Sequence, residues 1–373
     1  MASRRTGKGL GDPGWDGESL VTSGRGRPRQ AGAARHRLTP APGRADAERV
    51  TTLPPGTTAW ILTDGKAGDL APCRGLAQAL GLVAEERRVA PRPPFSWLAP
   101  RGPADPRDLA LAPPWPDLAI AAGRRAVPVL RALRRRAGAA TFTVFLRDPR
   151  TGPGAADLIW VPEHDRLRGR NVLVTLAGPH PVSAARLAAA RAAPDPRLRA
   201  LPAPRAAILV GGDDRRGRVR PQAAAAFLSG LERLAGEASL MITPSRRTPP
   251  ALRAALRDLA SRRSGFFHDG SGADPYLALL ALADAIVVTA DSANMVAEAA
   301  ATGSPILLGE LTETYARHRP FFAALRQYGA VHPFDGRLEG SRYEPLDFTP
   351  AIAEAVAAAY LRRRDPQTHP GGP

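Results

Sequence analysis

The stretch that decides the fold runs from Ala285 to Leu308 and reads AIVVTADSANMVAEAAATGSPILL. Its first five residues are apolar and mostly β-branched, as in a parallel strand that is covered on both faces. A polar turn at Asp291 follows, and then an alanine-rich helix that Gly303 and Pro305 end before the next strand. This strand–helix–strand order predicts an α/β protein with a parallel sheet.

The polar turn carries groups that suit a bound anion or sugar. Asp291, Ser292 and Asn294 offer oxygen atoms for capping, and the first N–H groups of a helix have no partner within it. Open α/β sheets bind anions at such a turn, because the positive end of the helix dipole meets the carboxyl end of a strand. Glu298 lies near the same helix face and is a candidate for binding ligand hydroxyls. The alternative is that any strand–helix–strand unit needs a cap and a glycine stop.

Length and composition limit what the chain can be. Its 373 residues suffice for two α/β domains and a tail, and 44% of them are hydrophobic. The net charge is +17, but only Lys8 and Lys66 are lysines, so the arginine excess indicates a coding bias as much as a polyanionic partner. Aromatic residues make up 5%, too few for obvious base-stacking platforms. We therefore expect no specific nucleic-acid partner.

Cysteine usage and hydropathy bear on the compartment. Cys73 is the only cysteine, so no intrachain disulfide can form and a cytoplasmic location is expected. We interpret its thiol as a core group. No apolar run is long enough to cross a bilayer, so the protein is expected to be soluble. A peripheral association with the inner membrane, or a protein partner, stays open.

The order of elements predicts the domain organisation. Residues 1–55 are rich in Gly, Arg, Pro and Ser and are expected to be a disordered basic tail, unless they are a targeting arm or result from a start codon placed too far upstream. Residues 56–193 and 205–348 alternate strands and helices and predict two Rossmann-like domains. Residues 194–204 are expected to be a proline-rich linker. Residues 349–373 are expected to be a helix and tail, and the sequence leaves open whether the helix packs back on the first domain.

Short apolar runs predict the strands, and longer periodic segments predict the helices. The predicted strands are 60–63, 83–89, 118–121, 141–146, 158–161, 172–175, 206–210, 239–243, 266–267, 285–289 and 306–308. The predicted helices include 127–136, 222–234, 250–259, 274–282 and 350–363.

A series of segments gives the chain a specific resemblance. They are WILTDGKAGD (60–69), AGRRAVPVLR (122–131), TFTVFLRDPR (141–150), ADLIWVPEHDRLRG (156–169), LVGGDDRR (209–216), MITPSRRTP (241–249), the segment 269–305 and GAVHPFDGRLE (329–339). In this order they resemble the mitochondrial fission elongated-mitochondria (Elm-type) family. Bacterial members of that family are often labelled nucleoside-diphosphate-sugar epimerases or glycosyltransferases. The resemblance implies two Rossmann-like domains with parallel sheets in a GT-B-type arrangement, the first for an acceptor and the second for a donor.

The loop between the first strand and helix is the candidate for catalysis. Asp64, Lys66 and Asp69 stand there with two glycines that permit a close backbone approach. The loop is neither a Walker A loop nor GxGxxG. The resemblance implies that it faces a cleft, where Asp64 or Asp69 is the candidate general base and Lys66 meets a phosphate. The alternative is that Asp69 merely caps the helix.

The remaining candidate residues follow other predicted strands. The expected donor-binding set is Gly211, Gly212, Asp213, Thr243, Ser245, Arg246, Asp291, Ser292, Asn294 and Glu298, in which a guanidinium suits a diphosphate. The other expected cleft residues are Arg147, Asp148, Glu163, His164 and Ser271. The histidines show no metal-ligand spacing, so no metal and no cofactor is expected.

The resulting hypothesis is a metal-independent glycosyltransferase that uses a nucleotide-sugar as substrate, with an unknown acceptor. An epimerase is disfavoured, because the Tyr-x-x-x-Lys pair and GxGxxG loop of short-chain epimerases are missing. The rival is a non-catalytic adaptor, since eukaryotic members of the resembling family are implicated in recruiting a dynamin-like protein to the mitochondrial outer membrane.

Overall fold

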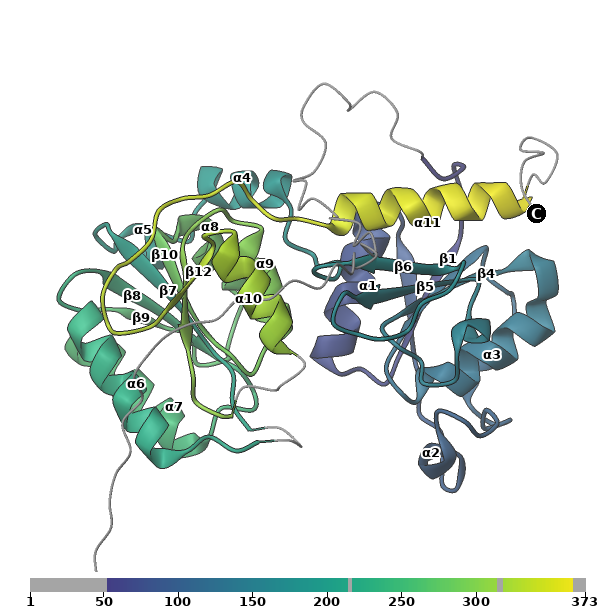
Figure 1. The fold of residues 1–373 in the computed structure, drawn as a ribbon, viewed down its shortest axis with the longest axis horizontal. Coiled ribbons are helices and arrows are strands. Elements are labelled where there is room, and N and C mark those ends of the chain that lie inside the picture. Colours follow the sequence, from purple (N-terminus) through teal and green to yellow (C-terminus); the bar gives the residue numbers. More distant parts are fainter. Residues whose placement is uncertain (1–51, 214–216, 314–317, 365–373) are drawn as a thin grey trace, which may run out of the picture. The chain divides into compact units, whose positions relative to one another are not determined.

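A computed structural model describes residues 52–213, 217–313 and 318–364. Within these ranges the chain builds two six-stranded sheets, and every pair of neighbouring strands is parallel. The predicted α/β class with two parallel sheets is therefore confirmed. Each sheet and the helices packed on it are called here the first and the second half (Figure 1).

The first half has the strand order β2-β1-β3-β4-β5-β6. Its elements are β1 (Ala59–Thr63), α1 (Ala67–Ala79), β2 (Ala84–Arg88), α2 (Phe95–Leu98), β3 (Leu118–Ala122), α3 (Ala126–Ala137), β4 (Phe142–Leu146), β5 (Leu158–Pro162) and β6 (Val172–Thr175). Successive residues of β1 face opposite cores, because Trp60 and Leu62 pack in one cluster and Ile61 in the other. This sheet is thus covered on both faces.

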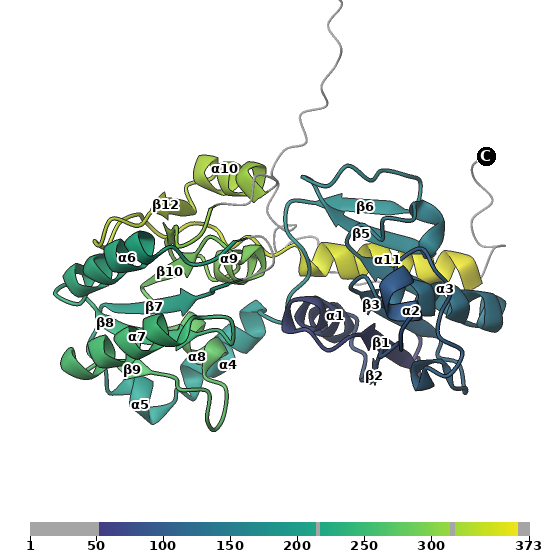
Figure 2. The same ribbon diagram turned by 90° about the horizontal axis from the view of Figure 1, so that it is seen from below.

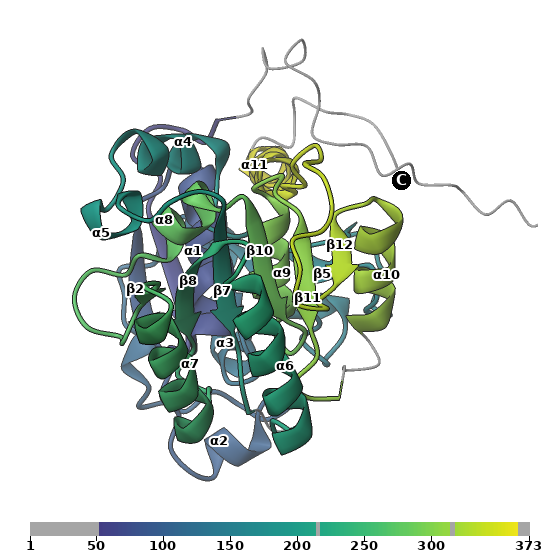
Figure 3. The ribbon, with the colours of Figure 1, turned by 90° about the vertical axis from the view of Figure 1, so that its left-hand side faces the viewer.

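The second half has the order β12-β11-β10-β7-β8-β9. Its elements are α4 (Ala184–Ala192), α5 (Pro196–Arg199), β7 (Arg205–Val210), α6 (Pro221–Leu234), β8 (Ser239–Pro244), α7 (Pro250–Arg262), β9 (Phe266–Phe267), α8 (Tyr276–Leu282), β10 (Ala285–Thr289), α9 (Ala293–Ala300), β11 (Ile306–Gly309), α10 (Arg319–Gln327) and β12 (Val331–Pro333). Helices α6 and α7 cover one face, in front of β7 and β8 in Figure 3. Helices α8, α9 and α10 supply the core of the other face.

The last helix, α11 (Thr349–Arg364), belongs to the first half. Its buried side chains, Ile352, Val356 and Tyr360, share a cluster with Leu76 of α1. Figure 2 shows α11 among the elements of this half. Tyr360 also meets Phe142 of β4 edge to face, with ring centroids 6.0 Å apart. Helix α11 therefore packs back on the first half, an arrangement that the sequence left open.

Apolar side chains of the predicted tail and linker segments lie in the two cores. Residues 1–51 lie outside the described ranges, but Leu53, placed in the predicted tail 1–55, is buried in the core of the first half. The linker 194–204 is also not a bare connection, because Leu198 and Leu201 are buried in the core of the second half. Leu187 of α4 lies in that same core, although the predicted first domain extends to 193. Apolar side chains in these short segments thus pack into the cores, although the prolines around them predicted a tail and a linker.

None of the helices within the described ranges is both long and apolar enough to span a bilayer.

Candidate functional site

The candidate loops follow the strands at which each sheet reverses its order. β7 lies between β8 and β10, and β1 lies between β2 and β3. The connections from such a strand leave toward opposite sides, which opens a crevice at the carboxyl ends where α/β proteins bind ligands. Asp64 follows β1, Gly211 follows β7 and Asp291 follows β10. The topology therefore positions the predicted loops where a ligand site is expected.

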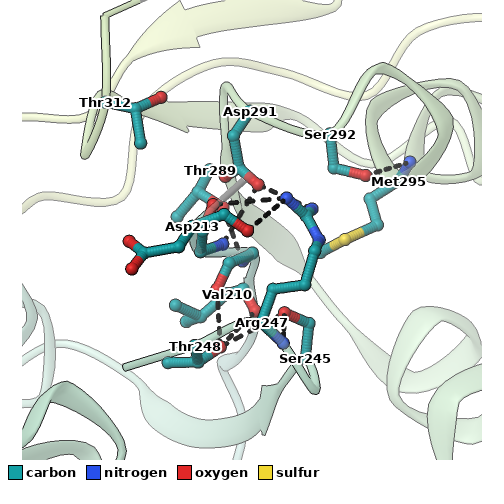
Figure 4. Close-up of polar contacts among 12 residues, drawn as sticks. Val210, Asp213, Ser245, Arg247, Thr248, Thr289, Asp291, Ser292, Met295 and Thr312 are labelled. Atoms are coloured by element: carbon teal, nitrogen blue, oxygen red, sulfur yellow. Dashed lines mark hydrogen bonds and ion pairs between the residues drawn. The ribbon is translucent and has the colours of Figure 1, made fainter. Parts of the chain in front are cut away.

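Asp291 organises the loops after β7 and β8 (Figure 4). Its Oδ2 atom accepts hydrogen bonds from the Gly212 amide at 3.0 Å and from Arg247 Nη2 at 2.8 Å. Only 4% of its side chain is exposed, and its Oδ1 atom is buried without a hydrogen-bond partner among the described residues. A side chain at Gly211 would collide with this carboxylate. Asp291 therefore holds the two loops together and leaves one acceptor oxygen unused.

The neighbouring backbone is fixed by further hydrogen bonds. The Gly211 amide donates to Thr289 Oγ1 at 2.7 Å, and Thr248 Oγ1 donates to the Gly211 carbonyl at 2.5 Å. A side chain at Gly212 would collide with the backbone of Arg247. Asp213 accepts from the Val219 amide at 2.8 Å. This close approach of two loops explains the glycines in steric terms.

Helix α9 begins beside these loops. Ser292 is its N-cap, and its Oγ accepts from the Met295 amide at 3.4 Å (Figure 4). The amides of the first helical turn have no acceptor within their own helix and carry the positive end of its dipole. Anion binding at the start of α9 stays a prediction.

Glu298 lies deeper on α9 and is buried. Its Oε2 accepts a hydrogen bond of 2.5 Å from the hydroxyl of Tyr276 at the start of α8. Burial raises the pKa of Glu298 from 4.5 to about 7, although the bond from Tyr276 works against this rise. Burial also raises the pKa of Tyr276, so the phenol stays protonated and donating. Glu298 therefore exchanges a proton near neutral pH in a fixed orientation.

Asn294 connects α9 to the start of α1 and to the residue that follows β4. Its Oδ1 accepts from Arg147 Nη2 at 2.6 Å, and its Nδ2 donates to the Gly68 carbonyl at 3.0 Å. Arg147 has a φ of 87°, a conformation that is uncommon for a residue other than glycine. The strained backbone directs Arg147 toward Asn294 from the end of β4. One side chain thus joins residues far apart in the sequence.

The three candidate catalytic residues have different surroundings. The side chain of Asp64 is 7% exposed and forms an ion pair with that of Lys66, which is 60% exposed. Asp69 lies on α1 beside Gly123, where an added side chain would meet its Oδ2 at 2.8 Å. Burial raises the pKa of Asp69, while the nearby Arg147 guanidinium opposes the rise. Asp69 is therefore a carboxylate whose basicity is raised by burial, and Asp64 is the counter-ion of Lys66.

A cavity of about 1580 Å³ collects half of the predicted site. The predicted residues that line it are Lys66, Asp69, Arg147, Ser245, Arg246, Asp291, Ser292, Asn294 and Glu298. Arginines 220, 246, 319 and 326 also line it, all of them exposed. The side chains of these four arginines have no hydrogen bond or ion pair to any residue in the described ranges. The cavity therefore presents free cations to a ligand.

Other predicted residues lie away from this cavity. His164 lines a separate cavity of about 50 Å³, which also includes Arg147, Asn294 and Glu298, and its ring meets His318 at 5.6 Å. Ser271 is exposed and donates to Asp269 at 2.6 Å in a surface turn. Asp148 accepts from the Arg150 amide at 2.7 Å, and Glu163 is exposed. Asp64, Gly211, Gly212, Asp213 and Thr243 do not line the large cavity, and the loop glycines stand behind it as supports.

Sequence reasoning missed the residues that complete the site. Arg247, not the predicted Arg246, forms the ion pair with Asp291, and adjacent arginines give no spacing that separates their roles. Tyr276 lies 22 residues before Glu298, so only the fold brings the two together. Arginines 319 and 326 lie on α10, a helix that the sequence analysis did not predict. An amphipathic pattern over this helix was the available signal.

Within the described ranges no group of three His, Cys, Asp or Glu side chains has the geometry of a metal site. The absence of a metal from the reaction stays a prediction.

Comparisons with known proteins give a family match and several likenesses of fold. A family model described as Mitochondrial fission ELM1 matches residues 67–360. The mitochondrial fission protein ELM1 of Arabidopsis thaliana is 28% identical over 276 residues, which cover 66% of this chain and 64% of that protein. The match thus spans less than two thirds of that relative's length.

In fold the chain resembles UDP-GlcNAc 2-epimerases and GT-B glycosyltransferases. The UDP-GlcNAc 2-epimerase of Methanocaldococcus jannaschii has a TM-score of 0.48 and 12% identity, over 82% of this chain and 99% of that one. A UDP-glucosyltransferase from Polygonum tinctorium has a TM-score of 0.44 and 11% identity, over 83% of this chain and 94% of that one.

Proposed function

The chain belongs to the mitochondrial fission ELM1 family, and we propose that it is a metal-independent glycosyltransferase that uses a nucleotide-sugar donor. The observation that carries this proposal is the large cavity lined by the α9 N-terminus and by arginines 220, 246, 319 and 326. Unpaired guanidinium groups and helix N–H donors suit a diphosphate, which carries several negative oxygens in a small volume.

In the proposed reaction the second half binds the donor. Arg246 and the amides at the start of α9 contact the diphosphate, and Glu298 contacts hydroxyl groups of the donor. Tyr276 keeps the Glu298 carboxyl in one orientation through its 2.5 Å hydrogen bond. This binding set stabilises the negative charge that develops on the departing diphosphate.

The first half supplies the base. An acceptor hydroxyl attacks the anomeric carbon of the donor while the bond from that carbon to the diphosphate oxygen breaks, and the bonding pair leaves with the diphosphate. Asp69 takes the proton of the attacking hydroxyl, because it lines the cavity and burial raises its pKa toward the range useful to a general base. Lys66, held by Asp64, stands at the N-cap of the same helix, α1, and contacts the acceptor.

The proposal is tested by a thermal-shift panel of nucleoside diphosphates and sugar nucleotides with the full chain. A ligand that binds only the native state raises the melting temperature. Arg246→Ala and Glu298→Gln each weaken binding by about tenfold or more, since a charge-assisted contact contributes about 1.5–3 kcal/mol. The matched control is Arg135→Ala on the exposed surface of α3, which leaves binding unchanged. Wild-type binding by both site variants would show that the donor site is elsewhere.

Catalysis is separated from binding by the first-half variants. Asp69→Asn, Asp64→Asn and Lys66→Ala retain donor binding but lose sugar transfer or donor hydrolysis. A non-catalytic adaptor would tolerate all three changes and keep its protein partner. Absence of any nucleotide binding or turnover across the panel would overturn the enzyme proposal in favour of the adaptor.

A further inference from the structure

The connection between β2 and β3, residues 89–117, exposes large apolar side chains outside the candidate site. Trp97 is 73% exposed and Leu98 is 52% exposed, both on the short helix α2, and Leu109 is 86% exposed. In Figures 1 and 3 α2 projects beyond the sheet of its half. Exposed tryptophan and leucine side chains next to one another are unusual on a surface that stays in water.

This connection is held rigidly. The buried carboxylate of Asp105 accepts two hydrogen bonds from Arg92, from Nε at 2.8 Å and from Nη2 at 2.7 Å. Asp108 accepts a hydrogen bond from the Ala90 amide at 3.2 Å. Arg124, which lies between β3 and α3, donates a hydrogen bond to the Ala99 carbonyl at 2.6 Å. Because these bonds fix the segment on both sides of α2, the exposure of Trp97 is a feature of the folded surface.

The charge that the connection presents to solvent is positive. Of its three carboxylates, Asp105 and Asp108 are buried, with 1% and 9% exposure, and both accept hydrogen bonds. The third, Asp117, forms an ion pair with Arg364. Arg101 and Arg107 are exposed, and their side chains have no hydrogen bond or ion pair to any residue that the structure describes. The surface therefore combines apolar side chains with unpaired cations.

We propose that residues 95–109 form a docking surface for an anionic phospholipid bilayer. Trp97 and Leu98 enter the headgroup region, where an indole ring is favoured because one end is apolar and its N–H can meet water or a carbonyl. Arg101 and Arg107 contact lipid phosphates. Trp97 and Leu98 are exposed on the projecting helix α2, so the surface can insert into a deformable lipid layer.

The test is co-sedimentation of the full chain with vesicles of phosphatidylcholine and phosphatidylglycerol, compared with vesicles of phosphatidylcholine alone. Wild type binds the anionic vesicles, and added salt weakens binding because it screens the arginine contacts. Trp97→Ser combined with Leu98→Ser reduces the partition coefficient by about tenfold or more, since each exposed side chain loses apolar transfer energy. Arg101→Ala with Arg107→Ala reduces binding to the anionic vesicles selectively.

Val83 provides the matched control. It is 98% exposed and lies between α1 and β2, outside the proposed surface. Val83→Ser therefore binds vesicles like wild type, and all variants keep the wild-type melting temperature and nucleotide binding. The proposal is overturned if wild type ignores anionic vesicles, if the Trp97 and Leu98 variant binds like wild type, or if Val83→Ser loses as much binding. Vesicle binding and nucleotide binding are independent readouts, so failure of one leaves the other intact.

Discussion

At the scale of single residues, Glu298 joins the chemistry of the site to the stability of the fold. A carboxyl buried beside Tyr276 avoids the cost of an isolated buried charge by holding a proton up to near neutral pH. The same group lines the cavity and so remains available to a ligand. Stability and binding therefore respond to the same titration.

Glu298 makes the stability of the free protein depend on pH. Its folded pKa of about 7 lies above the ordinary value of 4.5, so the native state binds more protons than the unfolded state between these values. The free energy of unfolding therefore falls as pH rises from about 4.5 to about 7, by up to about 3 kcal/mol from this group. Glu298→Gln removes this slope while its amide oxygen still accepts from Tyr276. Denaturant unfolding of both proteins across this pH range checks the difference, and equal slopes would contradict the assignment.

Asn294 tests the contact between α9 and the first half. Asn294→Ala removes the bonds to Arg147 and to the Gly68 carbonyl and is expected to lower the free energy of unfolding by about 1–3 kcal/mol. Asn294→Asp keeps the acceptor for Arg147 and is expected to lower the free energy of unfolding by less. Urea unfolding of wild type and the two variants ranks their stabilities, and an alanine variant as stable as wild type would show that these two hydrogen bonds contribute nothing.

The residue scale is also where prediction from sequence is least complete. Strand endings located Asp291, Ser292 and Glu298, because a parallel sheet brings the carboxyl ends of its strands to one edge. They did not indicate which side chain faces a ligand and which holds a loop. Arg246 and Arg247 differ in this respect, and the difference depends on side-chain directions that adjacent sequence positions do not encode.

At the scale of elements, hydrophobic pattern predicted most of the architecture. The runs at 118–121, 158–161 and 285–289 became buried central strands, with ends within one or two residues of those expected. Strand β12 was missed, because its three residues, Val331–Pro333, include a histidine and a proline and form an edge. Helix α10 was missed as well, although it carries two of the arginines in the cavity.

Helix α11 is an element whose contribution is measurable. Ile352 is fully buried against the first half, so Ile352→Ala leaves a cavity and is expected to lower the free energy of unfolding by about 2–5 kcal/mol. Glu354→Ala, an exposed position on the same helix, is expected to change it by less than about 0.5 kcal/mol. Urea denaturation compares the two, and similar losses would mean that α11 is not part of this core.

At the scale of the whole molecule, the described segment before β1 is tied to the core more closely than composition indicated. The proline- and glycine-rich start predicted a tail as far as residue 55, yet Leu53 packs with α11 and β1 in the first core. The low average hydrophobicity of residues 1–55 gave no indication that one leucine packs in the core, and only the three-dimensional contacts show it.

Two truncations test this anchor. Deletion of residues 1–55 is expected to cost about 2 kcal/mol or more relative to deletion of residues 1–51, because the longer deletion removes the buried Leu53 side chain. Leu53→Ala in the full chain should reproduce much of the difference. Thermal unfolding followed by circular dichroism measures it, and identical melting curves for the two truncated chains would contradict the packing.

The central claim is that the large cavity binds a diphosphate group through the arginines that the second half contributes to it. Isothermal titration of the full chain with matched nucleoside diphosphates and monophosphates tests it directly, with Arg246→Ala and the Arg135→Ala control beside wild type. The predicted result is a preference for the diphosphate in wild type and in the control, and a loss of about tenfold or more of that preference in Arg246→Ala. Equal affinity of wild type for both nucleotides, or an unchanged preference in Arg246→Ala, would contradict the claim.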